Sequence, residues 1–169
     1  MHVFFMGEKQ VGKTTVITSF LDKSGLAADG FMTYWEPTRP DERKLYLAPF
    51  ALEKLGAEHR LIATDFGHGL SPVPEVTEVF DTYGKSLLDN SGSCDCIVMD
   101  ELGFIEANAK HFLASVMARI DGEIPIIGVL KKCDMQFIGA ICAHKNVILK
   151  DVTAENREET LNWLLERFS

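Results

Sequence analysis

The sequence predicts an α/β domain, a three-layer fold with a mostly parallel central sheet, and two observations lead to this class. Short apolar segments alternate with amphipathic segments along the chain, as in strands joined by helices. Two apolar segments, residues 2 to 6 and 96 to 99, run directly into residues that bind phosphate or cations at the carboxyl ends of strands. A length of 169 residues fits one domain, residues 1 to 169.

The first two elements are a strand and a helix joined by a glycine loop. Residues 2 to 6 are apolar apart from His2, which indicates a strand. Apolar side chains then recur at helical spacing from residue 13, and Gly25 gives a natural stop, so we expect a helix over residues 13 to 24.

A region of different character follows. Residues 31 to 35, 44 to 47 and 60 to 64 have the composition of short strands, and the segment 36 to 41 between the first two, with two prolines, is typical of a turn or mobile loop. We therefore expect a β-ribbon, antiparallel in part, inserted into the α/β frame at about residues 30 to 65. A second loop with glycines and prolines at residues 67 to 74 precedes a helical stripe over residues 76 to 87.

The remaining elements continue the alternation. Residues 96 to 101 form an apolar run that ends in acidic residues, which indicates a central parallel strand buried on both faces. Helices are expected at 112 to 120, 137 to 141 and 161 to 168, and strands at 124 to 130 and 147 to 149.

Residues 7 to 14 match the phosphate-loop (P-loop, Walker A) pattern G-x-x-x-x-G-K-[ST], with the strand before it and the helix after it that the pattern requires. In such a loop the backbone N–H groups and the helix N-terminus surround a phosphate chain. Lys13 would reach the β- and γ-phosphates, and the Thr14 hydroxyl would bind magnesium. The predicted nucleotide-binding residues are Gly7, Glu8, Lys9, Gln10, Val11, Gly12, Lys13, Thr14 and Thr15.

A second acidic motif supports this interpretation. Asp100 follows four apolar residues, and we expect it to hold Mg²⁺ opposite Thr14. Glu101 comes next, where the chain is expected to turn, and its carboxylate would orient an attacking water molecule. The alternative is a solvated acidic loop after a core strand. We therefore predict Mg²⁺ with a nucleoside triphosphate (NTP) at this site, with Glu101 and Lys13 as catalytic residues.

Composition argues against several classes of partner and location. A net charge of −8 and the lack of a basic run argue against nucleic-acid binding. The apolar run at residues 124 to 130 is too short to span a membrane, and the loop at residue 7 leaves no room for a signal peptide, so we expect a cytoplasmic protein. The cysteines lack zinc-type pairing, and Cys96 and Cys142 are expected in the core.

The chain resembles the cancer-related, thermophile-type (THEP-like) nucleoside-triphosphatases over almost its whole length. The likeness is carried by MHVFFMGEKQVGKTT at the start, by residues 30 to 33, by DELGFIE at 100 to 106 and by VTAENR at 152 to 157. The resemblance implies magnesium-dependent hydrolysis of NTPs with broad base tolerance. It also implies metal-associated and catalytic roles for Asp100 and Glu101, and positions near the nucleotide for Asn156 and Arg157. The sequence departs from the family at Glu8, Lys9 and Gln10, where glycine or proline is common, and between residues 36 and 55.

Other residues allow two interpretations. Arg157 either contacts the nucleotide or forms a surface ion pair with Glu155 or Glu159. Gly103 either donates its N–H to a γ-phosphate or is a turn residue, and Glu106 either supports the site or complements a helix dipole. Lys131-Lys132-Cys133-Asp134 lies where a GTPase would carry N-K-x-D, but the asparagine is missing.

The leading functional hypothesis is hydrolysis of NTPs, with slow turnover because no arginine finger is evident. The alternatives are a P-loop kinase for a nucleotide or small metabolite, and a partner-activated NTP-binding switch. Only Arg39 and Arg43 are clustered in the ribbon, whereas small kinases usually carry several arginines in a lid, which argues against a kinase. The sequence identifies no protein partner.

Overall fold

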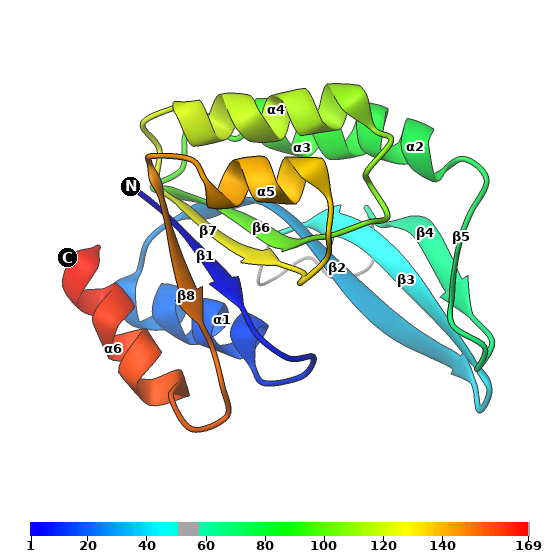
Figure 1. Ribbon diagram of the computed structural model, residues 1–169, viewed down its shortest axis with the longest axis horizontal. Coiled ribbons are helices and arrows are strands. Elements are labelled where there is room, and N and C mark those ends of the chain that lie inside the picture. The colour runs from blue at the N-terminus through cyan, green and yellow to red at the C-terminus, as the bar shows by residue number, and fades with distance from the viewer. Residues whose placement is uncertain (51–57, 169) are drawn as a thin grey trace.

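The computed structural model describes residues 1 to 50 and 58 to 168, and shows helices on both faces of one sheet (Figure 1). Residues 51 to 57, in the segment assigned to the ribbon, lie outside the described residues. The strands are β1 (His2–Met6), β2 (Ala28–Arg39), β3 (Glu42–Pro49), β4 (Arg60–Asp65), β5 (Leu70–Pro72), β6 (Cys96–Leu102), β7 (Ile126–Leu130) and β8 (Val147–Asp151). The helices are α1 (Lys13–Ser24), α2 (Val76–Val79), the π-helical turn η1 (Phe80–Gly84), α3 (Lys85–Asp89), α4 (Lys110–Asp121), α5 (Gln136–Cys142) and α6 (Arg157–Arg167).

The sheet has the strand order β5-β4-β3-β2-β6-β7-β1-β8. The pairs β2–β6, β6–β7, β7–β1 and β1–β8 are parallel, and β2, β3, β4 and β5 pair antiparallel. Helices α1 and α6 cover one face, and the helices from α2 to α5 cover the other (Figure 1). The predicted three-layer, mostly parallel fold is therefore confirmed.

The β-ribbon is an extension of the main sheet rather than a separate insertion. Residues 28 to 32 of β2 pair with β6, and the rest of the strand continues beyond that edge with β3 alone as its partner. The turn predicted over residues 36 to 41 is therefore wrong in most of its length, because β2 runs through Arg39. Pro37 is tolerated inside this strand because β2 pairs only with β3 at that point and its other side is open. Proline has no N–H to donate, and on an open edge no hydrogen bond is lost. The predicted loop at 67 to 74 likewise contains the short strand β5.

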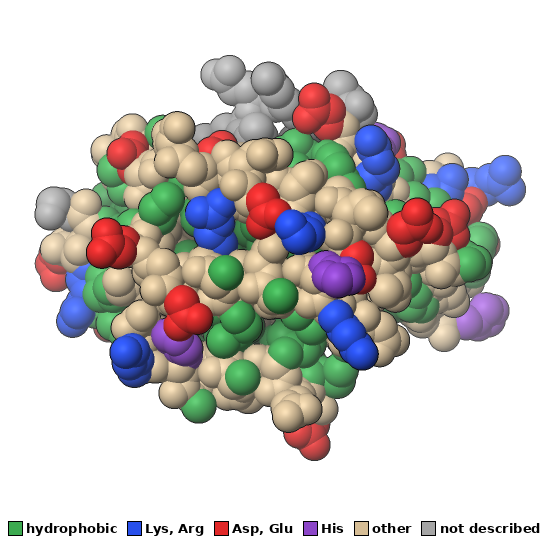
Figure 2. Space-filling model, turned by 90° about the horizontal axis from the view of Figure 1, so that it is seen from above, with side chains coloured by type: hydrophobic (Ala, Val, Ile, Leu, Met, Phe, Trp, Pro, Cys, Tyr) green, Lys and Arg blue, Asp and Glu red, His purple; other side chains and the backbone are tan. Residues whose placement is uncertain are grey.

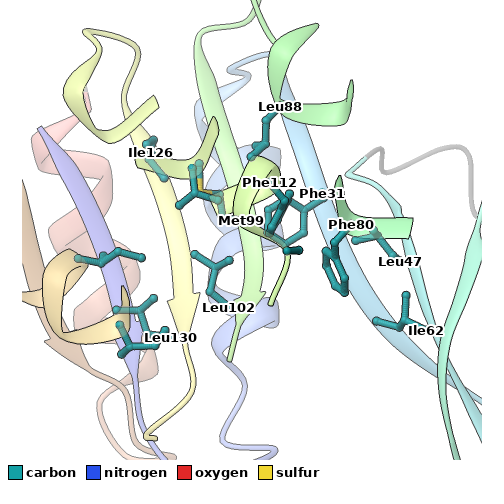
Figure 3. Close-up of a cluster of buried hydrophobic side chains, with 14 of the residues drawn as sticks. Phe31, Leu47, Ile62, Phe80, Leu88, Met99, Leu102, Phe112, Ile126 and Leu130 are labelled. Atoms are coloured by element: carbon teal, nitrogen blue, oxygen red, sulfur yellow. The ribbon is translucent and has the colours of Figure 1, made fainter. Parts of the chain in front are cut away.

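Two hydrophobic cores follow from the two covered faces. On the α1 side, the predicted stripe of Val16, Ile17, Phe20 and Leu21 is buried. On the other side, the Phe112 ring meets the rings of Phe31 and Phe80 with centroids 5.4 and 5.0 Å apart. Figure 3 shows Phe80 close to Leu47 and Ile62, so the π-helical turn closes the core over the extended strands. Cys96 is buried as expected, whereas Cys142 is only partly buried against this core.

Gly30 of β2 pairs with Val98 of β6, and we expect Gly30→Ala to destabilise the protein by about 3 kcal/mol or more. Its φ is +119°, and an added Cβ would lie 2.0 Å from the carbonyl oxygen of Val98, a backbone atom that has no room to move. The matched control is Gly25→Ala, where φ is +70° but nothing lies within 4 Å, and where we expect a loss of about 1 kcal/mol. Urea unfolding of the two variants would measure the difference, and equal losses would contradict the close approach.

Neither positive nor negative charge dominates the face covered by α3, α4 and α5. Figure 2 shows basic, acidic and histidine side chains interspersed on the face covered by α3, α4 and α5. Among residues 1 to 50 and 58 to 168, no helix has both the length and the apolar character needed to cross a bilayer.

Candidate functional site

The glycine loop has the backbone conformation of an anion-binding nest. Gly7, Gln10 and Gly12 all have positive φ, which turns successive N–H groups toward one side. No side chain caps α1, and its first turn contains no acidic residue. Because no cap or acidic side chain from α1 itself occupies the backbone N–H groups at its N-terminus, this loop can receive a phosphate.

The loop is held in place by the segment after β8. The Val152 N–H donates to the Met6 carbonyl oxygen over 2.8 Å. A Cβ on Gly7 would lie only 2.3 Å from the Val152 carbonyl oxygen, so glycine is required there on steric grounds as well as by its φ of +143°. The loop therefore depends on a segment more than 140 residues later in the sequence.

Lys13 lies across the loop. Its Nζ donates to the carbonyl oxygens of Gly7 over 3.0 Å and Glu8 over 2.7 Å. This arrangement holds the ammonium group over the concave side of the loop, beside the position that a phosphate chain would take.

Thr14 and Asp100 meet as predicted. The Thr14 hydroxyl donates to the Asp100 carboxylate over 2.6 Å, which joins the first turn of α1 to the carboxyl end of β6. Asp100 is 6% exposed, and this burial raises the pKa of its carboxyl group to about 6, although the hydrogen bond from Thr14 opposes the shift.

Glu101 lines the same cleft as Asp100 for a reason that differs from the predicted one. Strand β6 does not end at Glu101 but continues to Leu102, and the register with β7 shifts between Asp100 and Leu102. That shift interrupts the alternation that would otherwise send Glu101 to the opposite face. The Asp100–Glu101 peptide bond is cis. The Glu101 carboxylate lies 3.8 Å from the ammonium nitrogen of Lys131, which follows β7.

The residues at this position fit magnesium. Mg²⁺ takes oxygen ligands and is usually held by one or two carboxylates together with substrate phosphates, rather than by an all-protein cage. The hydroxyl of Thr14 and the carboxylate of Asp100 are such oxygens, side by side at the helix N-terminus. Within the described ranges, no cluster of three or more His, Cys, Asp or Glu side chains offers an alternative metal site.

Glu106 is a buried carboxyl group behind the acidic motif. It is 3% exposed, and it accepts a hydrogen bond from the N–H of Gly103. The Gly103 N–H is thus bonded within its own turn here, and its predicted contact with a γ-phosphate stays a prediction. Burial raises the pKa of Glu106 to about 7, and the charge of Glu101 adds to this, whereas Gly103 and Lys131 oppose it.

We expect the free energy of unfolding of the Glu106→Gln variant to increase relative to that of the unchanged protein as the pH rises. The Glu106 pKa lies at about 7 in the folded chain against an ordinary value of 4.5, so the folded state binds this proton more tightly. The stability of the unchanged protein therefore falls between about pH 4.5 and 7, by on the order of 3 kcal/mol. Glutamine does not ionise and escapes this loss. Glu101 and Lys131 are the neighbours whose charges act on the group.

Urea unfolding at pH 5 and pH 8 checks this expectation. The two proteins should be nearly equal in stability at pH 5, and the variant should be the more stable at pH 8. Glu123→Gln serves as control, because Glu123 is exposed and its ionised carboxylate is not buried in the folded protein. The same difference between variant and parent at both pH values would contradict an ionising buried Glu106.

Asn156 and Arg157 lie beside the loop rather than in the cleft. The Asn156 amide accepts from the Thr153 N–H over 2.8 Å and donates to the Asp151 carbonyl oxygen over 3.0 Å, so it orders the turn before α6. The Arg157 side chain contacts Gly12, because a Cβ there would be 2.8 Å from its Cδ. The Nε of Arg157 donates to the Ala154 carbonyl oxygen over 3.2 Å. Proximity to the loop agrees with the expected positions, while nucleotide contact by either residue stays a prediction.

The phosphate loop and the acidic motif line one cleft of about 870 Å³. Of the predicted residues, it is lined by Lys9, Gln10, Gly12, Lys13, Thr14, Thr15, Asp100, Glu101 and Gly103. Gly7, Glu8 and Val11 support the loop without lining the cleft, and Val11 packs against the α1 core. The cleft also includes Trp35, Arg43 and Lys131, which the sequence did not assign to the phosphate site. The position of Lys131 in the cleft could have been predicted from the sequence, because Lys131 directly follows a buried parallel strand and ligands bind at the carboxyl ends of such strands.

Comparison with known proteins agrees with this fold. The family model described as NTPase matches residues 2 to 165. The nucleoside-triphosphatase THEP1 of Thermotoga maritima is 27% identical over 98% of this chain and 94% of its own length. The cancer-related nucleoside-triphosphatase homolog of Bos taurus is 28% identical over 95% of this chain and 92% of its own length.

Two solved structures share the fold. THEP1 from the hyperthermophile Aquifex aeolicus superposes with a TM-score of 0.73 at 21% identity, covering 100% of this chain and 99% of that chain. The human cancer-related nucleoside triphosphatase superposes with a TM-score of 0.69 at 23% identity, covering 98% and 96%. Because the family model covers nearly the whole chain and the phosphate-loop geometry agrees with it, the protein belongs to the NTPase family that the sequence motifs indicated.

Proposed function

We propose that this protein hydrolyses NTPs, including ATP and GTP, to nucleoside diphosphates and phosphate with Mg²⁺. The observation that carries the proposal is the meeting of Thr14 and Asp100 at 2.6 Å at the end of a phosphate loop, with Glu101 lining the same cleft. A cation-binding pair and a candidate water-orienting carboxylate therefore face the place where a γ-phosphate would lie.

Each group has a defined part in the reaction. The loop N–H groups and the α1 N-terminus bind the phosphates, and Lys13 transfers its hydrogen bonds from the loop carbonyls to phosphate oxygens. Thr14 and Asp100 would hold Mg²⁺, which when bound neutralises charge on the phosphate oxygens. Glu101 orients a water molecule and accepts its proton as the water oxygen bonds to the γ-phosphorus and the bond to the β-phosphate oxygen breaks.

Broad base tolerance is supported by the groups beside the loop. Asn156 has its amide oxygen and nitrogen bonded to backbone atoms of its own turn. Lys131-Lys132-Cys133-Asp134 lacks the asparagine of a guanine-reading motif. Neither segment presents the paired donors and acceptors by which a site selects one base. The expected cytoplasmic location also stays a prediction.

The test is phosphate release from ATP, GTP, CTP and UTP with Mg²⁺ and no added acceptor. We expect free phosphate and the matching diphosphate from all four, with rates that differ by less than about tenfold. Turnover should be slow, because Arg43, the arginine that lines the cleft, is already paired with Asp65. Omission of Mg²⁺ should abolish release. Tight NTP binding without phosphate release would overturn the proposal and favour the kinase or switch alternatives.

A further inference from the structure

The cleft continues past the phosphate site onto the extended strands. We call this part the hairpin lobe. It is lined by Trp35, Arg43, Leu45, Ile62, Leu70 and Phe80. None of these residues belongs to the phosphate loop or to the acidic motif, and the proposed hydrolysis uses none of them.

The hairpin lobe lies on the γ-phosphate side of the site. In the sheet order, β6 and its acidic motif lie between the phosphate loop at β1 and the strands β2, β3 and β4 that carry the lobe. A triphosphate that extends from the loop toward Asp100 and Glu101 therefore leaves its nucleoside on the opposite side, toward the β8–α6 turn. Ligand pockets of about 300 to 1,000 Å³ hold one drug-sized molecule, and the phosphates fill only the loop side of this 870 Å³ cleft, so the hairpin lobe has room for another ring system.

The floor of the lobe is apolar and preformed. Ile62 and Phe80 are 0% and 2% exposed, and Figure 3 shows the two side chains packed together between the strands and η1. Elsewhere in the cleft lining, by contrast, aromatic rings face water, because Trp35 is 36% exposed and Phe104 is 42% exposed. Exposed aromatic rings beside a pocket are surfaces on which a planar ring can stack.

The charges at the lobe are already paired. The Nε and Nη2 of Arg43 donate to one oxygen of Asp65 over 3.1 and 2.8 Å, and the other oxygen accepts from the N–H groups of Gly67 and Gly69. The Arg43 guanidinium also lies 4.3 Å from the centre of the Trp35 ring, which fixes the orientation of the indole. A paired, fixed set of charges next to apolar and aromatic walls favours an uncharged ligand that has polar edges.

We propose that the hairpin lobe binds a second small molecule, an uncharged planar heteroaromatic compound of the nucleoside class, beside the γ-phosphate of the bound NTP. This site lies beyond the proposed function and requires only that an NTP binds at residues 7 to 14. The ring stacks at Trp35 over the floor of Leu45, Ile62 and Phe80, and its polar edge faces the Arg43–Asp65 pair.

Trp35 itself reports the binding. The chain has two tryptophans, so Trp163→Phe leaves Trp35 as the only one. With the phosphate loop saturated by Mg²⁺ and the non-hydrolysable analogue AMP-PNP, adenosine, guanosine, cytidine and uridine are titrated in turn. We expect at least one nucleoside to change the Trp35 fluorescence saturably at millimolar concentration or below. Calorimetry on the otherwise unchanged Trp35→Ala protein should show affinity for that nucleoside reduced at least tenfold, with phosphate release from ATP within about threefold of the parent.

Phe66→Ala is the matched control, because Phe66 is 54% exposed but does not line the cleft, and it should leave nucleoside affinity unchanged. Leu70→Glu places a charge in the lobe and tests the same site should Trp35→Ala fail to fold. No saturable signal from any nucleoside would overturn the proposal. Displacement of the nucleoside by rising AMP-PNP would also overturn it, since both would then share the NTP site. Because AMP-PNP is not hydrolysed, a failure of the hydrolysis proposal leaves this result readable.

Discussion

Lys13→Ala is expected to lower phosphate release from NTPs by at least about 100-fold, the range found when one charge-stabilising donor is removed from a transition state. In the structure its ammonium group lies over the concave side of the loop, held by the carbonyl oxygens of Gly7 and Glu8. Alanine leaves the backbone nest in place but removes the lysine that the G-K-[ST] pattern provides for the β- and γ-phosphates. The measurement is steady-state phosphate release with Mg·ATP, together with nucleotide affinity.

Lys23→Ala is the matched control for this loss. Lys23 lies in the last turn of the same helix, far along it from the loop, so the substitution changes net charge equally without touching the site. Its rate should stay within about twofold of the parent, and both variants should unfold at nearly the parent's urea concentration. A Lys13→Ala protein that hydrolyses ATP at more than a third of the parent rate would contradict the role of Lys13.

Glu101→Gln is expected to reduce kcat by about 100-fold or more while nucleotide affinity changes little, because general-base and water-orienting groups contribute 10²- to 10⁴-fold. Glutamine keeps the size and the hydrogen-bonding oxygen but cannot accept a proton from water at neutral pH. Asp100→Asn should act differently, by weakening Mg²⁺ binding so that phosphate release requires a higher Mg²⁺ concentration, since Asp100 bonds to Thr14 rather than facing Lys131.

The ion pair of Glu101 with Lys131 supplies the comparison that separates catalysis from structure. Lys131→Met removes the same pair, at 3.8 Å, from its other end. Should Glu101 act only by holding Lys131, the two variants would lose activity equally. We expect instead that Lys131→Met keeps most of the activity. Full hydrolysis by Glu101→Gln, with none by Asp100→Asn, would show that the water-orienting role of Glu101 is wrong.

The phosphate loop was predictable because its chemistry is local. The spacing of Gly7, Gly12, Lys13 and Thr14 between a strand and a helix is a property of consecutive residues, and the structure places the loop accordingly. The core stripe of α1 and the buried strand before Asp100 follow from periodicity for the same reason. The pairing of Thr14 with Asp100 needed one further rule, that the carboxyl ends of parallel strands meet along one edge.

Other features depend on contacts between distant segments and have no local signature. The segment from 36 to 41 contains two prolines and has the composition of a turn, yet pairing with β3 extends β2 through most of it. The register shift beside β7 places Glu101 in the cleft, and nothing in the residues 96 to 102 alone indicates that shift. Long-range pairing overrides local preference in both places.

The sequence by itself therefore determined the phosphate loop, the acidic motif and the three-layer class, because each rests on residue type at short spacing. Only the tertiary structure decided that Val152 fixes Gly7, that Lys131 faces Glu101, and that Trp35 and Arg43 extend the cleft beyond the phosphates. These contacts join residues 30 to more than 140 positions apart, and their geometry is set by how strands pair and helices cover the sheet. Local composition carries no record of that geometry, which is why the hairpin lobe appears only in the folded chain.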